Sequence, residues 1–113
     1  MPARDSNIAR AYARGLEFAR AGAYFEAHEE LETAWRAAGA GERDFFQGLV
    51  HAVVFAYQAG RSRVVGAERQ REKAIRRLTP YAPEHRRLDV ARLLDALGRA
   101  QTDLREELVE RDP

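Results

Sequence analysis

Apolar residues recur along the chain three and four positions apart, which is the spacing of one face of a helix. No stretch alternates apolar and polar side chains in the way of a half-buried strand bounded by turn residues. We therefore predict an all-α fold. The expected helices cover about residues 6–21, 24–38, 43–59 and 62–79, and a fifth starts near Asp89.

The segment 43–59 differs from the others because apolar side chains cover nearly every direction around it. A helix that is apolar all round is buried, so we expect this one at the centre of the fold. The last segment carries a single stripe that continues well beyond Leu97. We expect its helix to extend through residues 98–113 and to pack there against another copy of the chain. The stripe comprises Val90, Leu93, Leu94, Leu97, Leu104 and Leu108.

The turns after the first and third expected helices are similar in sequence. Ala-Gly-x-Tyr-Phe-Glu-Ala begins at Ala21 and Ala-Gly-Arg-Ser-Arg-Val-Val-Gly-Ala begins at Ala59, an offset of 38 to 40 residues. Helix pairs that repeat near this period are typical of tetratricopeptide-like (TPR-like) stacks. A compact antiparallel bundle with short loops predicts the same helices. The sequence leaves both arrangements open.

The composition narrows the class of protein. Its 113 residues suffice for one domain, 1–113, and 45% hydrophobic with 33% charged residues is typical of globular rather than disordered or membrane proteins. The absence of cysteine excludes disulfides and thiolate chemistry. The N-terminus lacks the apolar run of a signal peptide. We expect a cytoplasmic protein that does not enter a membrane.

Polar residues interrupt the apolar faces of the second and third expected helices. In HEELETAW, His28 and Glu32 lie four positions apart on one helix face, and in FFQGLVHAV so do Gln47 and His51. If the two helices form an antiparallel hairpin, His28 lies at the height of His51. Glu32 then lies at the height of Gln47, and Glu29 lies nearby. The residues expected to pack around this polar cluster are Tyr24, Trp35, Phe46 and Gly48.

Three interpretations of the polar cluster remain open. It is a hydrogen-bond network that fixes helix packing, the lining of a ligand pocket, or a metal site. His28, Glu32 and His51 form a ligand combination suited to zinc or iron, the only cofactors that the sequence suggests. Glu29 would then be the general base of a metal-dependent hydrolase. The pattern departs from His-Glu-x-x-His metalloproteases because Glu32 replaces their second histidine.

The fourth expected helix carries more basic than acidic side chains. RNA binding through this helix is a further alternative. The whole chain, however, has a net charge of only +1, and no aromatic residues alternate with the basic ones. A solvated face is therefore the stronger interpretation, and we do not expect nucleic acid as a partner. This basic patch comprises Arg69, Arg71, Lys73, Arg76 and Arg77.

The two polar motifs belong to a longer pattern of residues. Its members are Gly22, Phe25, Glu26, Ala27, His28, Glu29, Leu31, Glu32, Trp35, Phe46, Gln47, Gly48, Leu49, Val50, Ala52, Gly60, Ala67, Asp89, Val90 and Leu94. This pattern resembles the prokaryotic family known as domain of unknown function 309, over about residues 16–97. The resemblance implies a compact α-helical domain without an assigned activity, whose polar cluster maps onto His28, Glu29, Glu32 and Gln47.

These observations favour a non-enzymatic helical module that binds a partner protein or a small ligand. A homodimer formed through exposed helix faces is one form of such binding. The alternative is a metal-dependent hydrolase that uses His28, Glu32 and His51.

Overall fold

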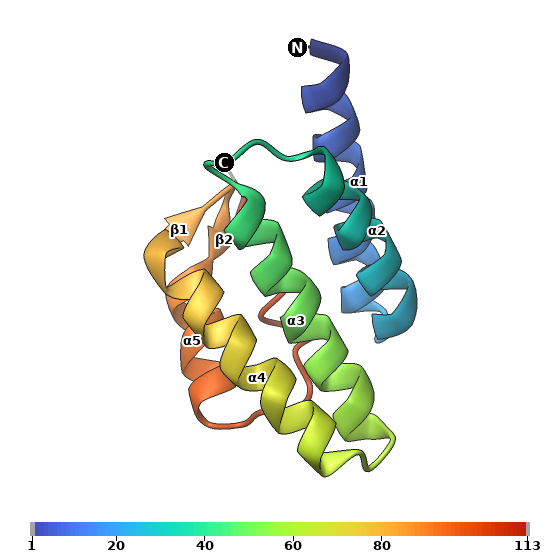
Figure 1. Ribbon diagram of the computed structural model, residues 1–113, viewed down its shortest axis with the longest axis vertical. Coiled ribbons are helices and arrows are strands. Elements are labelled where there is room, and N and C mark those ends of the chain that lie inside the picture. The colour runs from blue at the N-terminus through green and yellow to red at the C-terminus, as the bar shows by residue number, and fades with distance from the viewer. Residues whose placement is uncertain (1, 113) are drawn as a thin grey trace.

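The computed structural model describes residues 2–112 and confirms the all-α prediction. The first helix begins at Pro2 rather than near Ser6. No helix among the described residues combines the length and the apolar character needed to cross a membrane. The helices, labelled in Figure 1, are α1 (Pro2–Arg20), α2 (Tyr24–Ala37), α3 (Arg43–Gly60), α4 (Val64–Leu78) and α5 (Val90–Gly98).

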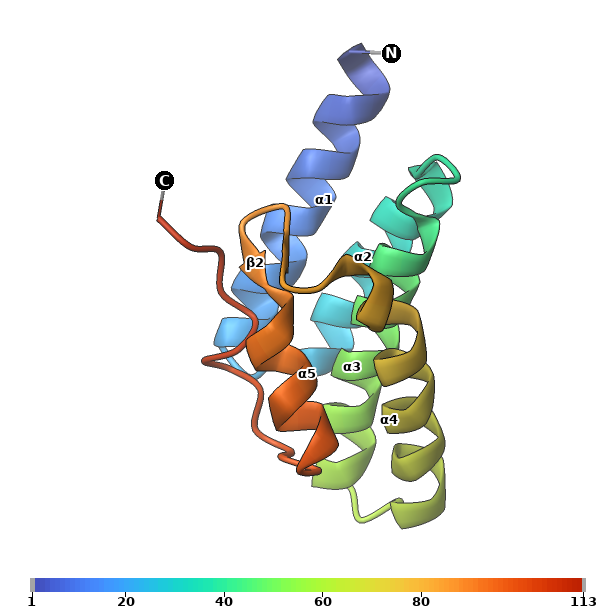
Figure 2. The ribbon, with the colours of Figure 1, turned by 90° about the vertical axis from the view of Figure 1, so that its left-hand side faces the viewer.

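The helices pack in two layers, and α3 lies in the middle of one of them. Figure 2 shows α2, α3 and α4 on one side of the molecule, with α1, α5 and the C-terminal segment on the other. Helix α3 contacts both α2 and α4. Its central position was predicted, and the structure confirms it. The buried residues of α3 are Phe45, Phe46, Gly48, Leu49, Val50, Ala52, Val53, Phe55 and Ala56.

The turns that follow α1 and α3 have the same hydrogen bonds. The amide of Ala23 donates to the carbonyl of Phe18 at 2.9 Å, and the amide of Arg63 donates to the carbonyl of Gln58 at 3.0 Å. Each residue of the second turn follows its counterpart by 40 positions. The hairpins α1–α2 and α3–α4 are therefore joined by turns of the same backbone geometry, in which Gly22 (φ 78°) is equivalent to Ser62 (φ 58°). Ala59 and Gly60, which resemble Ala21 and Gly22 in sequence, lie two positions earlier, at the end of α3.

Each of these hairpins brings its helices together at a glycine. A Cβ atom at Gly15 would lie 2.7 Å from Cγ of Leu31, and one at Gly48 would lie 2.6 Å from Cγ of Leu78. At either position a Cβ would force the facing leucine or its helix to move, so glycine is the residue that fits without a shift. Gly48 thus allows α3 to approach α4, whereas the sequence led us to expect it between α2 and α3.

The fifth helix is shorter than predicted. Helix α5 ends at Gly98, and Ala100 has a left-handed backbone conformation with φ 57°. The amide of Ala100 donates to the carbonyl of Leu97 at 3.0 Å, and the amide of Gln101 donates to that of Ala96 at 2.9 Å. This pair of bonds is the Schellman pattern that ends a helix.

The prediction of a helix through residues 98–113 is therefore wrong for the part that the structure describes. Leu104 and Leu108 are nonetheless fully buried. They lie on an irregular segment that folds back over the core of its own chain, so they do not pack against another copy. The hydroxyl of Tyr24 accepts a hydrogen bond from the amide of Leu104 at 3.0 Å and so holds this segment against α2.

A short β-hairpin between α4 and α5 was not predicted. After a 3-10 turn at Thr79–Tyr81, β1 (Glu84–His85) pairs antiparallel with β2 (Leu88–Asp89). Arg86 and Arg87 in the connecting turn both have positive φ, 46° and 62°, as two-residue hairpin turns of type I′ require. Strands of two residues are too short to show an alternating pattern in the sequence.

Candidate functional site

The polar residues of α2 form a row of hydrogen bonds on one helix face. Nε2 of His28 lies 3.0 Å from Oε2 of Glu32. Arg36 donates to the other oxygen of Glu32 at 2.9 Å. A carboxylate bonded to one ring nitrogen fixes the orientation of the imidazole. His28 keeps 26% of its side chain exposed, so the ring is accessible from solvent.

The histidine of α3 is bonded to α4 and not to α2. Nδ1 of His51 lies 2.7 Å from Oε1 of Gln70, and since an amide oxygen only accepts, the ring nitrogen is the donor. Burial lowers the pKa of His51. The positive charges of Lys73, Arg77 and Arg76 lower it further. The folded protein therefore favours the neutral ring.

The predicted polar cluster is thus divided between two places. Within residues 2–112 no hydrogen bond joins His28 or Glu32 to Gln47 or His51. Gln47 is half-buried and Glu29 is exposed. The two histidines belong to separate hydrogen-bonded pairs.

The face of α3 that carries His51 explains this division. The ring centroids of Phe25 and Tyr57 are 5.7 Å apart, and His28 shares a pocket with Val54. His28 therefore lies near a residue about one helical turn beyond His51, closer to the end of α3. Gly48 approaches Leu78 of α4 and Gln58 approaches Gly66 of α4, so the stripe of α3 that carries His51 faces α4 rather than α2.

The same division removes the geometric basis of the predicted metal site. Residues 2–112 contain no group of three His, Cys, Asp or Glu side chains arranged to hold a metal ion. His28 and Glu32 are neighbours, but the third expected ligand, His51, is bonded to Gln70. The arrangement supports neither zinc nor iron at these residues, nor Glu29 as the base of a hydrolase.

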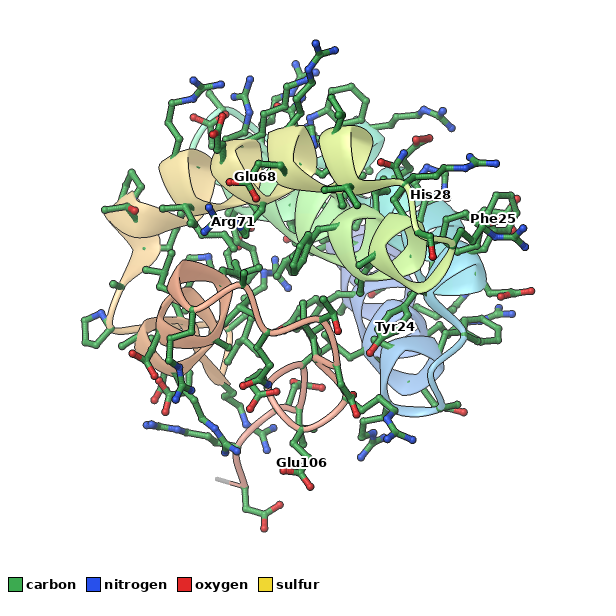
Figure 3. All side chains as sticks on the ribbon, turned by 90° about the horizontal axis from the view of Figure 1, so that it is seen from below. Tyr24, Phe25, His28, Glu68, Arg71 and Glu106 are labelled. Atoms are coloured by element: carbon green, nitrogen blue, oxygen red, sulfur yellow. The ribbon has the colours of Figure 1, made fainter. Side chains whose placement is uncertain are left out.

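An apolar pocket opens beside His28, between the start of α2 and the end of α3. Its volume is about 150 Å³. Phe25 is 47% exposed, and its ring centroid lies 5.7 Å from those of His28 and Tyr57. The guanidinium of Arg61 lies 4.8 Å over the Tyr57 ring. Figure 3 views the molecule from this end, and the lining residues are Tyr24, Phe25, His28, Val54, Tyr57 and Gln58.

Sequence reasoning identified His28 and Tyr24 but missed the rest of this pocket. Val54 and Tyr57 belong to the segment 43–59, which was expected to be buried on every side, whereas both are only half-buried. Phe25 was the available signal, because it is a large apolar residue outside the apolar stripe of α2. Such a residue on an otherwise polar face indicates an interaction surface.

The other residues predicted to surround the cluster lie elsewhere. Phe46 is fully buried against Tyr12 of α1, with ring centroids 5.9 Å apart. Trp35 is half-buried beneath Arg43, whose guanidinium lies 5.6 Å from the ring centroid. Of the predicted packing residues, Tyr24 is the one that lines the pocket.

The basic patch of α4 contains both paired and unpaired side chains. Arg71 bonds to Glu68 and donates to the carbonyl of Leu97 at 2.9 Å, which ties α4 to α5. Arg77 donates to Asp44 at 2.7 Å. Three members of the patch are exposed and form no ion pair within residues 2–112. They are Arg69, Lys73 and Arg76.

A wider hollow, about 730 Å³ in volume, lies along the C-terminal segment near Glu106. Its lining carries charges of both signs, and several of these are paired with one another. Arg92 lies 3.5 Å from Glu107, and Arg111 bonds to Asp89. Paired opposite charges favour neither an anion nor a cation, so the smaller pocket beside His28 is the stronger candidate.

Comparison with known proteins agrees with the family-like pattern of residues. The family described as "Domain of unknown function (DUF309)" matches residues 12–70, which include both histidines of the predicted cluster and the whole apolar pocket. No curated protein and no solved structure matches the chain. Because the matched region spans more than half of the 113 residues, the chain belongs to the DUF309 family.

Proposed function

We propose that this chain is a protein-interaction module whose α2–α3 pocket takes up one apolar side chain of a partner polypeptide. The observation that carries the proposal is the small apolar pocket beside the exposed Phe25.

The size of the pocket favours a side chain over a whole metabolite. Sites for drug-sized ligands occupy roughly 300–1,000 Å³, whereas this pocket measures about 150 Å³. An apolar cavity of about 150 Å³ accommodates one group the size of benzene. A single aliphatic or aromatic side chain therefore matches the space available.

The surroundings of the pocket resemble the centre of a protein interface. A large apolar residue is exposed at the edge of the pocket, namely Phe25 at 47%. Polar groups lie at the edge, as they do around interface hot spots. Nδ1 of His28 makes no hydrogen bond within residues 2–112, and Glu32 holds the ring in place. This nitrogen is available to a backbone group of the partner.

Saturation-transfer NMR with N-acetyl-leucinamide tests the proposal. This probe presents one leucine side chain between two amides, and we expect transfer from the protein to its methyl groups. Val54→Phe, which fills the pocket, should abolish the transfer, whereas Val65→Ser, outside the pocket, should retain it. Equal transfer in the wild type and in a folded Val54→Phe variant would contradict the proposal. The absence of transfer in both the wild type and the Val65→Ser variant would also contradict it.

A further inference from the structure

The repeated hairpins indicate which polypeptide supplies the side chain. We propose that the partner is a second copy of this chain, whose α4 packs along α2 so that Val65 of the second copy enters the pocket. The inference rests on the proposed function, because it assigns an occupant to the same site.

Equivalent positions of the two hairpins carry complementary side chains. The offset of 40 residues makes Phe25 of α2 equivalent to Val65 of α4, and both are exposed apolar residues, at 47% and 68%. One turn further along each helix, Glu29 is equivalent to Arg69. These two side chains are exposed, have opposite charges and form no ion pair within residues 2–112.

The arrangement of the helices allows these positions to meet. α2 and α4 flank α3 in one layer and run in the same direction, since both are antiparallel to α3 (Figure 1). Phe25 packs against Tyr57, and a Cβ at Gly66 would meet the side chain of Gln58, so both helices start at the same level of α3. A two-fold axis parallel to α3 then places α2 of each copy beside α4 of the other, in register.

The positions of opposite charges distinguish this arrangement from a dimer whose two-fold axis is perpendicular to the helices. An axis perpendicular to the helices would pair α2 with α2 and α4 with α4, so Glu29 of one copy would not face Arg69 of the other. The parallel axis instead pairs Glu29 with Arg69 and Phe25 with Val65, and the symmetry makes each contact twice. Arg36 and Arg76, further along the two helices, carry the same charge. We therefore place the contact over the first two turns of α2 and α4.

Sedimentation equilibrium across micromolar to millimolar concentrations tests this dimer. The wild type should reach twice the chain mass of 12.8 kDa. Glu29→Arg and Arg69→Glu each replace attraction with repulsion at two symmetry-related contacts, so either change should raise the dissociation constant roughly tenfold to a hundredfold. Val65→Ser should also weaken the dimer, whereas Val64→Ser, at the neighbouring exposed valine, should leave it unchanged.

Charge rescue provides the sharpest control. The double variant carrying both Glu29→Arg and Arg69→Glu restores both opposite-charge contacts and should dimerise like the wild type. An equimolar mixture of the two single variants should form heterodimers, because each of their two contacts again joins opposite charges. Circular dichroism of each variant checks that it has folded.

The outcomes separate this inference from the proposed function. A wild type that stays monomeric, or a dimer that survives both single reversals, would overturn the second-copy assignment. A monomeric wild type whose N-acetyl-leucinamide signal is lost in Val54→Phe would leave the pocket as a binding site for a different polypeptide. Loss of the dimer in the single variants with recovery in the double variant supports the assignment.

Discussion

Arg86 donates two hydrogen bonds to Glu42, at 2.5 and 2.8 Å, although 44 residues separate them in the sequence. His85 adds a third bond to the same carboxylate at 2.8 Å. The Arg86 guanidinium also lies 5.3 Å from the ring centroid of Phe46 in α3. The β-hairpin is thereby joined to the start of the central helix, so that α5 is held against the core.

Replacement of Arg86 should therefore destabilise the fold well away from the pocket. Arg86→Ala leaves Glu42 without its bidentate partner, and we expect the free energy of unfolding to fall by about 1 to 3 kcal/mol. Arg99→Ala is the matched control, because Arg99 pairs with Asp95 on the surface and should change stability by less than about 1 kcal/mol. Urea unfolding at neutral pH measures both. Equal effects of the two substitutions would contradict the structural role of Arg86.

Acid should weaken the same junction. Hydrogen bonds from Arg86 lower the pKa of Glu42 from its ordinary value of 4.5 to about 2, with His85 contributing and burial opposing. Because the pKa is lower in the folded state, the stabilisation is complete above about pH 4.5 and is lost as the pH falls towards 2. The loss should amount to about 1 to 3 kcal/mol, since the carboxylate is partly exposed to solvent.

Glu42→Gln supplies the comparison for this pH dependence. The amide does not titrate, so the variant should be less stable than the wild type at pH 6 and should lose less stability between pH 4.5 and 2. Denaturant unfolding across this range measures the difference. Parallel pH curves for the two proteins would show that Glu42 is not the titrating group.

His51 should add a second pH dependence closer to neutrality. Burial and nearby positive charges hold its pKa below the ordinary value of 6.5. Stability is then greatest above pH 6.5 and falls as the pH drops towards the lower pKa of the folded protein, because the unfolded chain binds the proton more readily. His51→Gln should flatten the unfolding free energy between pH 7.5 and 5.5. An NMR titration of the His51 ring that gives a pKa above 6.5 would contradict this prediction.

Local features of the site followed from the sequence, and distant ones did not. The His28–Glu32 pair lies within one helix, where a spacing of four residues brings side chains together in any register. His51 pairs instead with Gln70, 19 residues away. That contact depends on the level at which α4 packs on α3, which is set by the turn between them. Which face of α3 meets which neighbour is likewise set by packing, and it turns His51 towards α4 and away from His28.

The C-terminal leucines show a similar limit for the fold. Their spacing correctly marked Leu104 and Leu108 as buried, but burial alone does not specify the backbone that delivers them. Ala100, with positive φ, ends the helix by a local hydrogen-bond pattern that alanine rarely adopts. The central helix was predictable because its apolar residues cover nearly every direction, whatever packs against it.

The close approach of α3 and α4 gives a prediction with a simple control. Gly48→Ala would place Cβ 2.6 Å from Cγ of the fully buried Leu78, so the helices must separate and we expect a loss of about 1 to 3 kcal/mol. At Gly60 a Cβ would meet no atom within 4 Å, and Gly60→Ala should leave stability unchanged or raise it by up to about 1 kcal/mol. Thermal unfolding compares the two, and a Gly48→Ala variant as stable as wild type would show that the helices can separate freely.

The C-terminal segment should contribute to stability although it is irregular and lies outside the family match. Leu108 is fully buried, and Leu108→Ala should therefore cost about 2 to 5 kcal/mol through lost contacts and a cavity. Val109→Ala is the control, because the neighbouring Val109 is only half-buried and should cost less. Tyr24→Phe removes the hydroxyl that accepts from the Leu104 amide and should cost about 0.5 to 1.5 kcal/mol. If Leu108→Ala unfolds at the same denaturant concentration as the wild type, the segment is not part of the cooperative core. Its removal would then leave the two helical hairpins, and with them the pocket beside His28, intact.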